Sequence, residues 1–128
     1  MLEVSTATIC RLIDLAEEFH ALQDVDFTDN PGRMGDDFTS EALEPHQDNP
    51  FLAEFRSVVD DLNPDEQQQI VALLWLGRGD YEKDEWSDAL EYAAEAWTPT
   101  TGDYLIAHPM VADHLSTGLE QFGLSCED

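Results

Sequence analysis

Apolar residues recur at intervals of three and four along much of the chain, which is the spacing of one buried face of an α-helix. The first such stretch predicts a helix from about Thr6 to Leu22, with apolar positions at Ile9, Leu12, Ile13, Ala16 and Phe19. No stretch alternates convincingly with the period of two that a half-buried strand shows. The pattern therefore predicts an all-α fold.

Two Asn-Pro pairs mark the starts of the next helices. Asn is a favoured helix cap and Pro is favoured at the first helical position, so Asn49 and Asn63 are both expected to be caps. We expect one helix from Pro50 that ends at Asn63, and a second that begins at Pro64. Glu66 lies three residues after Asn63, and this spacing predicts a capping box.

The second of these helices contains seven consecutive apolar residues, from Ile70 to Leu76. A run of this length also fits a buried strand, but the strong start signal before it favours a helix. A helix that is apolar on nearly every side is a buried one, so we expect this segment at the centre of the core. Gly77-Arg78-Gly79 is expected to end the helix, since glycine readily takes the left-handed cap conformation.

The remaining patterns complete the predicted architecture. Further helices are expected at about Lys83 to Trp97, Thr101 to Ala107 and His108 to Phe122, with Gly123 as the last stop signal. Trp86, Ala89, Leu90, Ala93, Ala94 and Trp97 keep the helical period in the first of them. Residues 24–49 are rich in Asp, Asn, Gly and Pro without any period. We expect a single domain over residues 1–128, a compact bundle of five to six helices with a long acidic loop after the first helix.

The charge of the chain limits its partners. Twenty-nine acidic residues stand against five basic ones, which gives a formal net charge of -24, and Lys83 is the only lysine. Such a field repels phosphate, so direct binding to nucleic acid or to an anionic membrane surface is disfavoured, whereas basic proteins are attracted. Three explanations of the acidity stay open: a solvated surface that maintains solubility, a docking surface for a basic partner, and an imitation of nucleic acid by carboxylates.

The cysteines and the N-terminus predict a cytoplasmic location. Cys10 and Cys126 lie near opposite ends of the chain, and we expect free thiols in a reducing cytoplasm. No stretch approaches the roughly 20 apolar residues of a membrane span. The N-terminus, Met1-Leu2-Glu3-Val4, lacks the basic segment of a signal peptide.

The sequence contains residue types that can bind metals or perform catalysis, but they form no recognisable motif. Counted from Asp24, a calcium-binding loop would need glycine where Asp29 stands and glutamate where Gly35 stands. Neither a C-x-x-C nor an H-E-x-x-H pair is present, so the histidines are interpreted as structural, with His108 as a cap of the last helix. We predict no catalytic residue, no metal site and no cofactor.

A candidate interaction surface follows the core helix and comprises Arg78, Asp80, Tyr81 and Tyr92. Arg78 is expected to pair with Asp80, Asp84 or a carboxylate elsewhere. Tyr81 and Tyr92 fall off the main apolar stripe, and aromatic residues are favoured at interfaces. The other large aromatics of this half are expected in the core, namely Trp75, Trp86 and Trp97.

Several runs together resemble a known family of small bacterial proteins. They are Asp60-Asp61-Leu62-Asn63, Val71-Ala72-Leu73, Trp75-Leu76-Gly77-Arg78-Gly79-Asp80, Asp103-Tyr104-Leu105, the Pro109 to Leu115 stretch and Ser125-Cys126-Glu127. The family is a domain of unknown function, DUF3775. The resemblance covers nearly the whole chain and is weakest over residues 24–49. It implies a bacterial cytoplasmic origin and one intact domain, and it implies no activity, cofactor or catalytic residue.

The leading functional hypothesis is a non-enzymatic acidic helical protein-interaction module that binds a basic protein partner. The alternative is a nucleic-acid mimic that regulates a basic DNA-binding protein by occupying it. The third hypothesis is an uncharacterised enzyme, which requires a pocket with convergent polar groups and a shifted pKa. The oligomeric state stays open.

Overall fold

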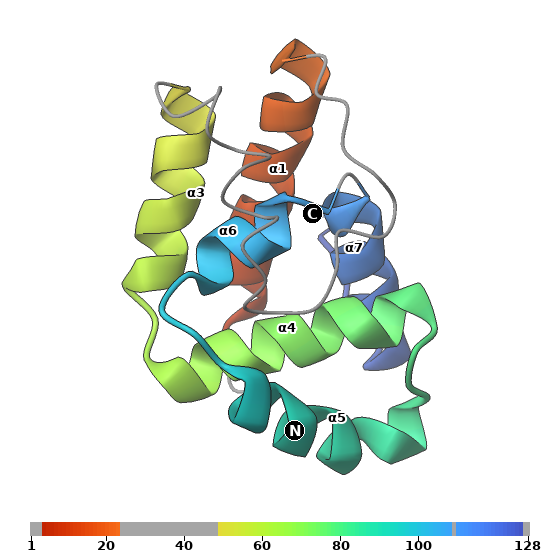
Figure 1. Cartoon of the computed structure of the whole chain (residues 1–128). Helices are drawn as coiled ribbons and strands as arrows, with labels where there is room; N and C mark the ends of the chain where they lie inside the picture. Colours follow the sequence, from red (N-terminus) through yellow and green to blue (C-terminus); the bar gives the residue numbers. More distant parts are fainter. Residues whose placement is uncertain (1–3, 24–48, 109, 127–128) are drawn as a thin grey trace.

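Helix α4 (Pro64–Arg78) crosses the middle of the molecule, and the other helices pack around it (Figure 1). The structure is a computed structural model that describes residues 4–23, 49–108 and 110–126. The other helices are α1 (Thr6–Gln23), α3 (Pro50–Asp60), α5 (Trp86–Ala96), α6 (Thr101–Ile106) and α7 (Val111–Gln121), with a 3₁₀ turn at Lys83–Glu85. These ranges contain helices and no strand, which confirms the all-α prediction.

The helices form two layers on α4. In Figure 1, α5 lies below α4, while α6 and α7 lie above it, and α4 contacts all three. Helix α1 packs against α3 and α7, and α3 packs against α6. The predicted loop at 24–49 lies outside the described residues except for Asn49.

The start signals of α3 and α4 act as the sequence predicts. The Asn49 side chain accepts hydrogen bonds from the backbone amides of Phe51 and Leu52, at 2.8 and 3.2 Å. Asn63 accepts from the amide of Glu66 at 2.8 Å, and the Glu66 carboxylate accepts from the amide of Asn63 at 3.0 Å. Both halves of the capping box are present, so amides that the first turn leaves unpaired are satisfied locally.

The apolar run of α4 forms the centre of the core. Every residue from Ile70 to Leu76 is buried, and the cluster around them includes Leu12 of α1, Phe55 of α3 and Leu115 of α7. Two expectations for α5 are wrong in detail. Trp97, expected in the core, is only partly buried, and Lys83 to Glu85 form a 3₁₀ turn before the α-helix begins at Trp86.

The backbones of α4 and α7 approach each other closely at two glycines. A Cβ atom placed on Gly77 would lie 1.7 Å from the backbone oxygen of His114. One placed on Gly118 would lie 2.7 Å from the backbone oxygen of Leu73. Gly77 is therefore an interior contact residue of α4, and the left-handed C-cap is Gly79, with a φ of 91°.

A buried amide joins the ends of three helices. The Gln67 side-chain nitrogen donates to the carbonyl oxygens of Val59 at 2.8 Å and Leu62 at 3.2 Å. Its oxygen accepts from the indole N–H of Trp97 at 2.7 Å. The end of α3, the start of α4 and the residue after α5 are thus held by one fully bonded side chain.

A disulfide between Cys10 and Cys126 corrects the prediction of free thiols. The two residues are 116 positions apart in sequence, and the bond ties α1 to the segment after α7. Distance along the chain gave no sign of this pairing, because it depends on how α1 packs against α7. A bond that closes so long a loop restricts the unfolded chain strongly.

We expect Gly77→Ala to lower the free energy of unfolding by about 2 kcal/mol or more, because the new methyl group displaces the backbone of α7. Gly102→Ala is the matched control, since its Cβ would meet its nearest atoms at 3.5 Å, an ordinary contact distance. We expect the control to change stability by less than about 1 kcal/mol. Urea unfolding of both variants measures this, and equal stabilities would contradict the close helix crossing.

We expect the Cys10→Ser/Cys126→Ser variant to lose about 2–5 kcal/mol of stability, because the long loop is no longer closed. A reducing agent should bring the wild type to the same stability and leave the variant unchanged. Urea unfolding with and without the reductant gives both values. Alkylation of two thiols in the folded, unreduced protein would contradict the bond.

Candidate functional site

The four predicted surface residues gather at one end of α4. Arg78 ends the helix, Asp80 and Tyr81 lie in the turn that follows, and Tyr92 projects from α5. The Trp75 ring contacts both tyrosine rings, with centroid distances of 6.1 Å to Tyr81 and 5.3 Å to Tyr92. We call Trp75, Tyr81 and Tyr92 the aromatic cluster.

The aromatic cluster passes from the core to the surface. Trp75 is 5% exposed, Tyr81 is partly exposed and Tyr92 is 46% exposed. The indole N–H of Trp75 donates to the hydroxyl of Tyr104 on α6 at 3.0 Å, which fixes the ring from its buried side. The exposed tyrosines therefore rest on a side chain that is already held in place.

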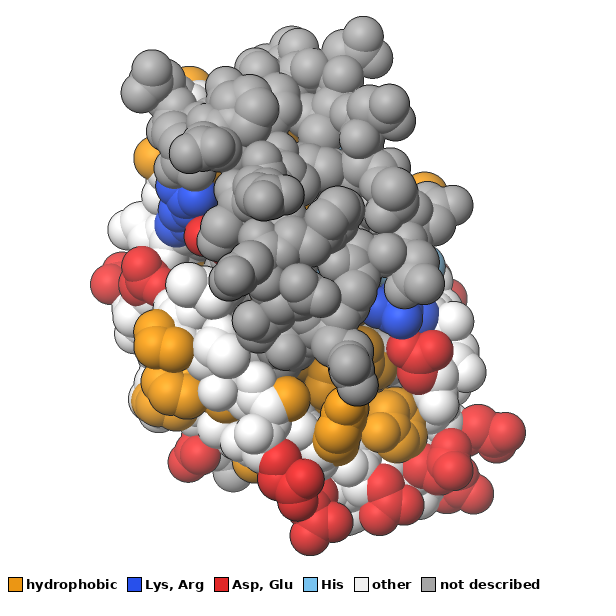
Figure 2. Space-filling model, viewed as in Figure 1, with side chains coloured by type: hydrophobic (Ala, Val, Ile, Leu, Met, Phe, Trp, Pro, Cys, Tyr) orange, Lys and Arg blue, Asp and Glu red, His pale blue; other side chains and the backbone are white. Residues whose placement is uncertain are grey.

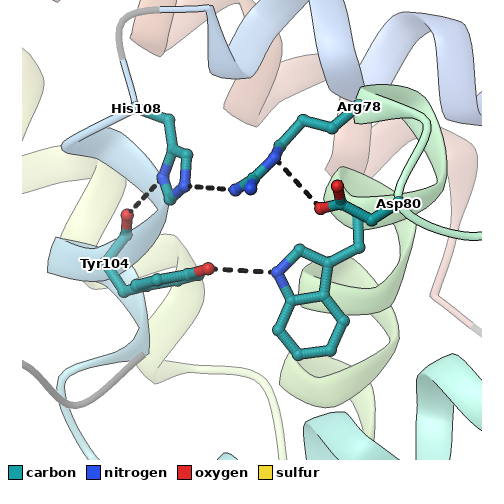
Figure 3. A network of polar contacts seen from close by, with 5 residues as sticks. Arg78, Asp80, Tyr104 and His108 are labelled. Atoms are coloured by element: carbon teal, nitrogen blue, oxygen red, sulfur yellow. Dashed lines mark hydrogen bonds and ion pairs between the residues drawn. The ribbon is translucent and has the colours of Figure 1, made fainter. Parts of the chain in front are cut away.

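Arg78 begins a polar chain that links α4 to α6 (Figure 3). Its Nε atom pairs with the Asp80 carboxylate at 3.2 Å, which confirms an expected partner. Its Nη1 atom donates to Nε2 of His108 at 3.0 Å. Nδ1 of His108 lies 2.9 Å from the carbonyl oxygen of Tyr104.

These bonds determine the form of His108. Arginine only donates hydrogen bonds, so Nε2 of His108 is the acceptor, and the proton is on Nδ1, which donates to Tyr104. Burial, together with the positive charge of Arg78, lowers the pKa of His108 to about 4, although its bonds to backbone oppose the shift. His108 is 2% exposed and does not cap α7, whose N-cap is Met110, so the predicted capping role is wrong.

Seven exposed carboxylates lie close in sequence to Tyr81 and Tyr92. We call them the acidic rim: Asp80, Glu82, Asp84, Glu85, Asp88, Glu91 and Glu95. Figure 2 shows acidic side chains along the lower edge of the molecule, where α5 lies, beside a patch of hydrophobic side chains. Burial raises the pKa of Tyr81, and so do Tyr92 and nearby carboxylates of the rim, Asp80 most strongly among them. The aromatic surface therefore lies in a negative field.

A groove lies beside Tyr81, between the turn after α4 and the end of α7. Its volume is about 690 Å³, and its lining includes Leu76, Tyr81, Glu82, Lys83, Asp84 and Gln121. Lys83 extends over the Phe122 ring, with its ammonium 5.7 Å from the ring centroid. We call this the Tyr81 groove.

The histidine of the site is held by hydrogen bonds within the fold. Both ring nitrogens of His108 are engaged, and the side chain is buried away from the groove residues. Among the described residues, no group of three or more His, Cys, Asp or Glu side chains is placed to hold a metal ion. Within the same ranges, no helix has the length and apolar character that crossing a membrane requires.

The sequence selected these four residues as candidates, and it missed the side chains that support them. Arg78, Asp80, Tyr81 and Tyr92 come together, although only the fold shows that both tyrosines rest on Trp75. Tyr104 and His108 were not connected with the site. Their spacing of four places them on one helical face, but no pattern shows that this face meets Arg78.

The fold and this surface define a small acidic all-helical domain with an aromatic cluster beside exposed carboxylates. The family model described as a protein of unknown function, DUF3775, matches residues 52–124. This is more than half of the chain, so the chain belongs to that family. The matched part contains α4 to α7 and the whole candidate site, whereas Cys10 and Cys126 lie outside it.

The match confirms the family resemblance over a shorter stretch than the sequence runs indicated, because the closing Ser125-Cys126-Glu127 falls beyond it. The searches of curated proteins and of solved structures give no match.

We expect His108 to lower the stability of the fold as the pH falls from about 6.5 towards 4. In this range the unfolded chain protonates its histidine while the folded protein keeps His108 neutral, so protonation favours unfolding. The difference between the unfolded and folded pKa values corresponds to a loss of about 3 kcal/mol in the free energy of unfolding once the pH is below both values. Urea unfolding between pH 7 and pH 4.5 should show a shallower pH dependence for His108→Gln, which retains a donor and an acceptor.

All other ionisable groups are the same in both proteins, so the difference between the two curves isolates His108. Identical pH dependence in the wild type and the variant would contradict a neutral, buried His108.

Proposed function

We propose that this chain is a non-enzymatic protein-interaction module that binds a basic partner through the aromatic cluster and the acidic rim. The observation that carries the proposal is Tyr92, which is 46% exposed, rests on Trp75 and stands on the helix that holds Asp88, Glu91 and Glu95. Tyr92 presents an aromatic ring at the surface, and aromatic side chains are among the residues that dominate binding energies at interfaces.

The support beneath Tyr92 favours a binding role. A ring that packs on a fixed neighbour loses little conformational entropy when a partner covers it. Trp75 is fixed by its bond to Tyr104, and Tyr92 lies 5.3 Å from it, centroid to centroid. The rim carboxylates add attraction for basic surfaces, which raises the rate of association and makes it depend on salt.

A regulator that imitates nucleic acid is the second candidate, and one feature of α5 favours it. Asp88, Glu91 and Glu95 are exposed and recur at intervals of three and four, so they form a row along one helix edge. A row of negative charges is what a DNA-binding surface recognises. This candidate predicts a partner that DNA displaces.

A bacterial cytoplasmic location belongs to the same proposal. Cytoplasmic proteins rarely keep disulfides. A cytoplasmic location therefore predicts that Cys10 and Cys126 are reduced in the cell. Alkylation of the thiols in cells quenched with acid measures this redox state.

We expect the immobilised protein to retain a basic protein from bacterial lysate at low salt and to release it at high salt, because the acidic rim contributes to binding. Tyr92→Ala should lose this partner, and Ser57→Ala, an exposed change on α3, should keep it. Mass spectrometry of the eluates reads the result, with thermal unfolding as the check that both variants fold.

Retention of the same proteins by wild type and Tyr92→Ala would refute the role of the aromatic cluster. Elution of the partner by added duplex DNA, at constant ionic strength, would favour the nucleic-acid mimic.

A further inference from the structure

We propose that the Tyr81 groove binds the guanidinium group of an arginine side chain on the basic partner. This inference rests on the proposed function and gives it a specific ligand chemistry. The groove has a volume of about 690 Å³, which lies within the range of small-molecule pockets, roughly 300–1,000 Å³. The side chain of Leu76 is buried at the groove, so the stem of an incoming arginine finds an apolar contact.

Two carboxylates of the groove have no ion-pair partner among the described residues. Glu82 and Asp84 line it, are exposed, and form no side-chain ion pair with the described residues. Their neighbours are already engaged, since Asp80 pairs with Arg78 and the Glu85 carboxylate accepts from the amide of Glu82. A cation that enters the groove therefore meets two carboxylates that form no ion pair within the described part of the chain.

The groove also has an aromatic wall. The Tyr81 ring lies against Trp75, with a centroid distance of 6.1 Å, so its position is fixed before a ligand arrives. Nearby carboxylates add negative potential at this ring, and cations bind favourably to such a face. Lys83 provides an example within the groove itself, because its ammonium already lies over the Phe122 ring.

The combination selects arginine over lysine. A guanidinium group is planar and weakly hydrated, so it stacks on a ring while its N–H groups donate to carboxylates beside the ring. An ammonium group is compact and strongly hydrated, and it cannot stack in this way. The wall of Tyr81 together with Glu82 and Asp84 offers both kinds of contact to a single guanidinium.

Three fluorescent tetrapeptides test the inference: tetra-arginine, tetra-lysine and tetra-citrulline, the last of which has nearly the shape of arginine without its charge. We expect fluorescence anisotropy to show the arginine peptide binding at least about fivefold more tightly than the lysine peptide, because only guanidinium stacks. The citrulline peptide should not bind. Equal affinities for arginine and lysine, or no binding of the arginine peptide, would overturn the inference.

Two double variants with the same change in charge locate the binding site. Glu82→Gln/Asp84→Asn removes the groove carboxylates, and Glu17→Gln/Asp60→Asn removes exposed carboxylates of α1 and α3 that lie outside both the groove and the acidic rim. We expect the groove variant to lose about tenfold in affinity for tetra-arginine and the control to lose less than about threefold. All of these positions are exposed, so both variants should fold.

Equal losses in the two double variants would show that binding follows net charge and would overturn the groove assignment. The proposed function is tested separately by Tyr92→Ala in lysate. A partner that needs Tyr92 but tolerates Glu82→Gln/Asp84→Asn would retain the interaction module and reject the arginine groove.

Discussion

The backbones of α4 and α7 touch at Gly77 and Gly118, and the arrangement of the described helices depends on this contact. Because neither position has room for a side chain, α7 lies directly against the helix that contains the buried run from Ile70 to Leu76. Helix α1 then packs on α7, and α5 covers the opposite side of α4. A helix that is buried on all sides needs neighbours this close, since any gap would leave Ile70 to Leu76 partly exposed.

The same crossing positions the candidate site. Arg78 and the turn with Asp80 and Tyr81 come directly after Gly77, so the place where α7 meets α4 determines where this turn leaves the core. The bond from Arg78 to His108 then joins the turn to the segment between α6 and α7. Because the buried His108 holds Arg78 by this hydrogen bond, the turn that carries Tyr81 is fixed to the core.

The basic residues that the structure describes lie at contacts between elements. Arg11 pairs with Glu54 across α1 and α3, Arg56 pairs with Asp103 across α3 and α6, and Lys83 lies over Phe122. Exposed pairs contribute little stability each. Their value here is that they offset repulsion where negatively charged helices meet, and the disulfide between Cys10 and Cys126 adds a constraint that does not depend on charge.

The sequence by itself determined the helical elements and the starts of α3 and α4, because these depend on neighbouring residues. Asn63 and Glu66 form a capping box because they lie three residues apart. The run from Ile70 to Leu76 is apolar on every side of the helix, so its burial could be predicted without knowing the neighbouring helices. The positions of Tyr81 and Tyr92 off the apolar stripe likewise predicted that they lie outside the centre of the core, and in the structure both rings contact Trp75.

Only the tertiary structure decided which helix faces meet. Gly77 resembled a stop signal in sequence, and its role as a contact with His114 depends on the position of α7. His108 resembled a cap, and its neutral form depends on Arg78 from another helix. Cys10 and Cys126 resembled separate thiols, because a bond between residues 116 positions apart follows from packing and leaves no local pattern.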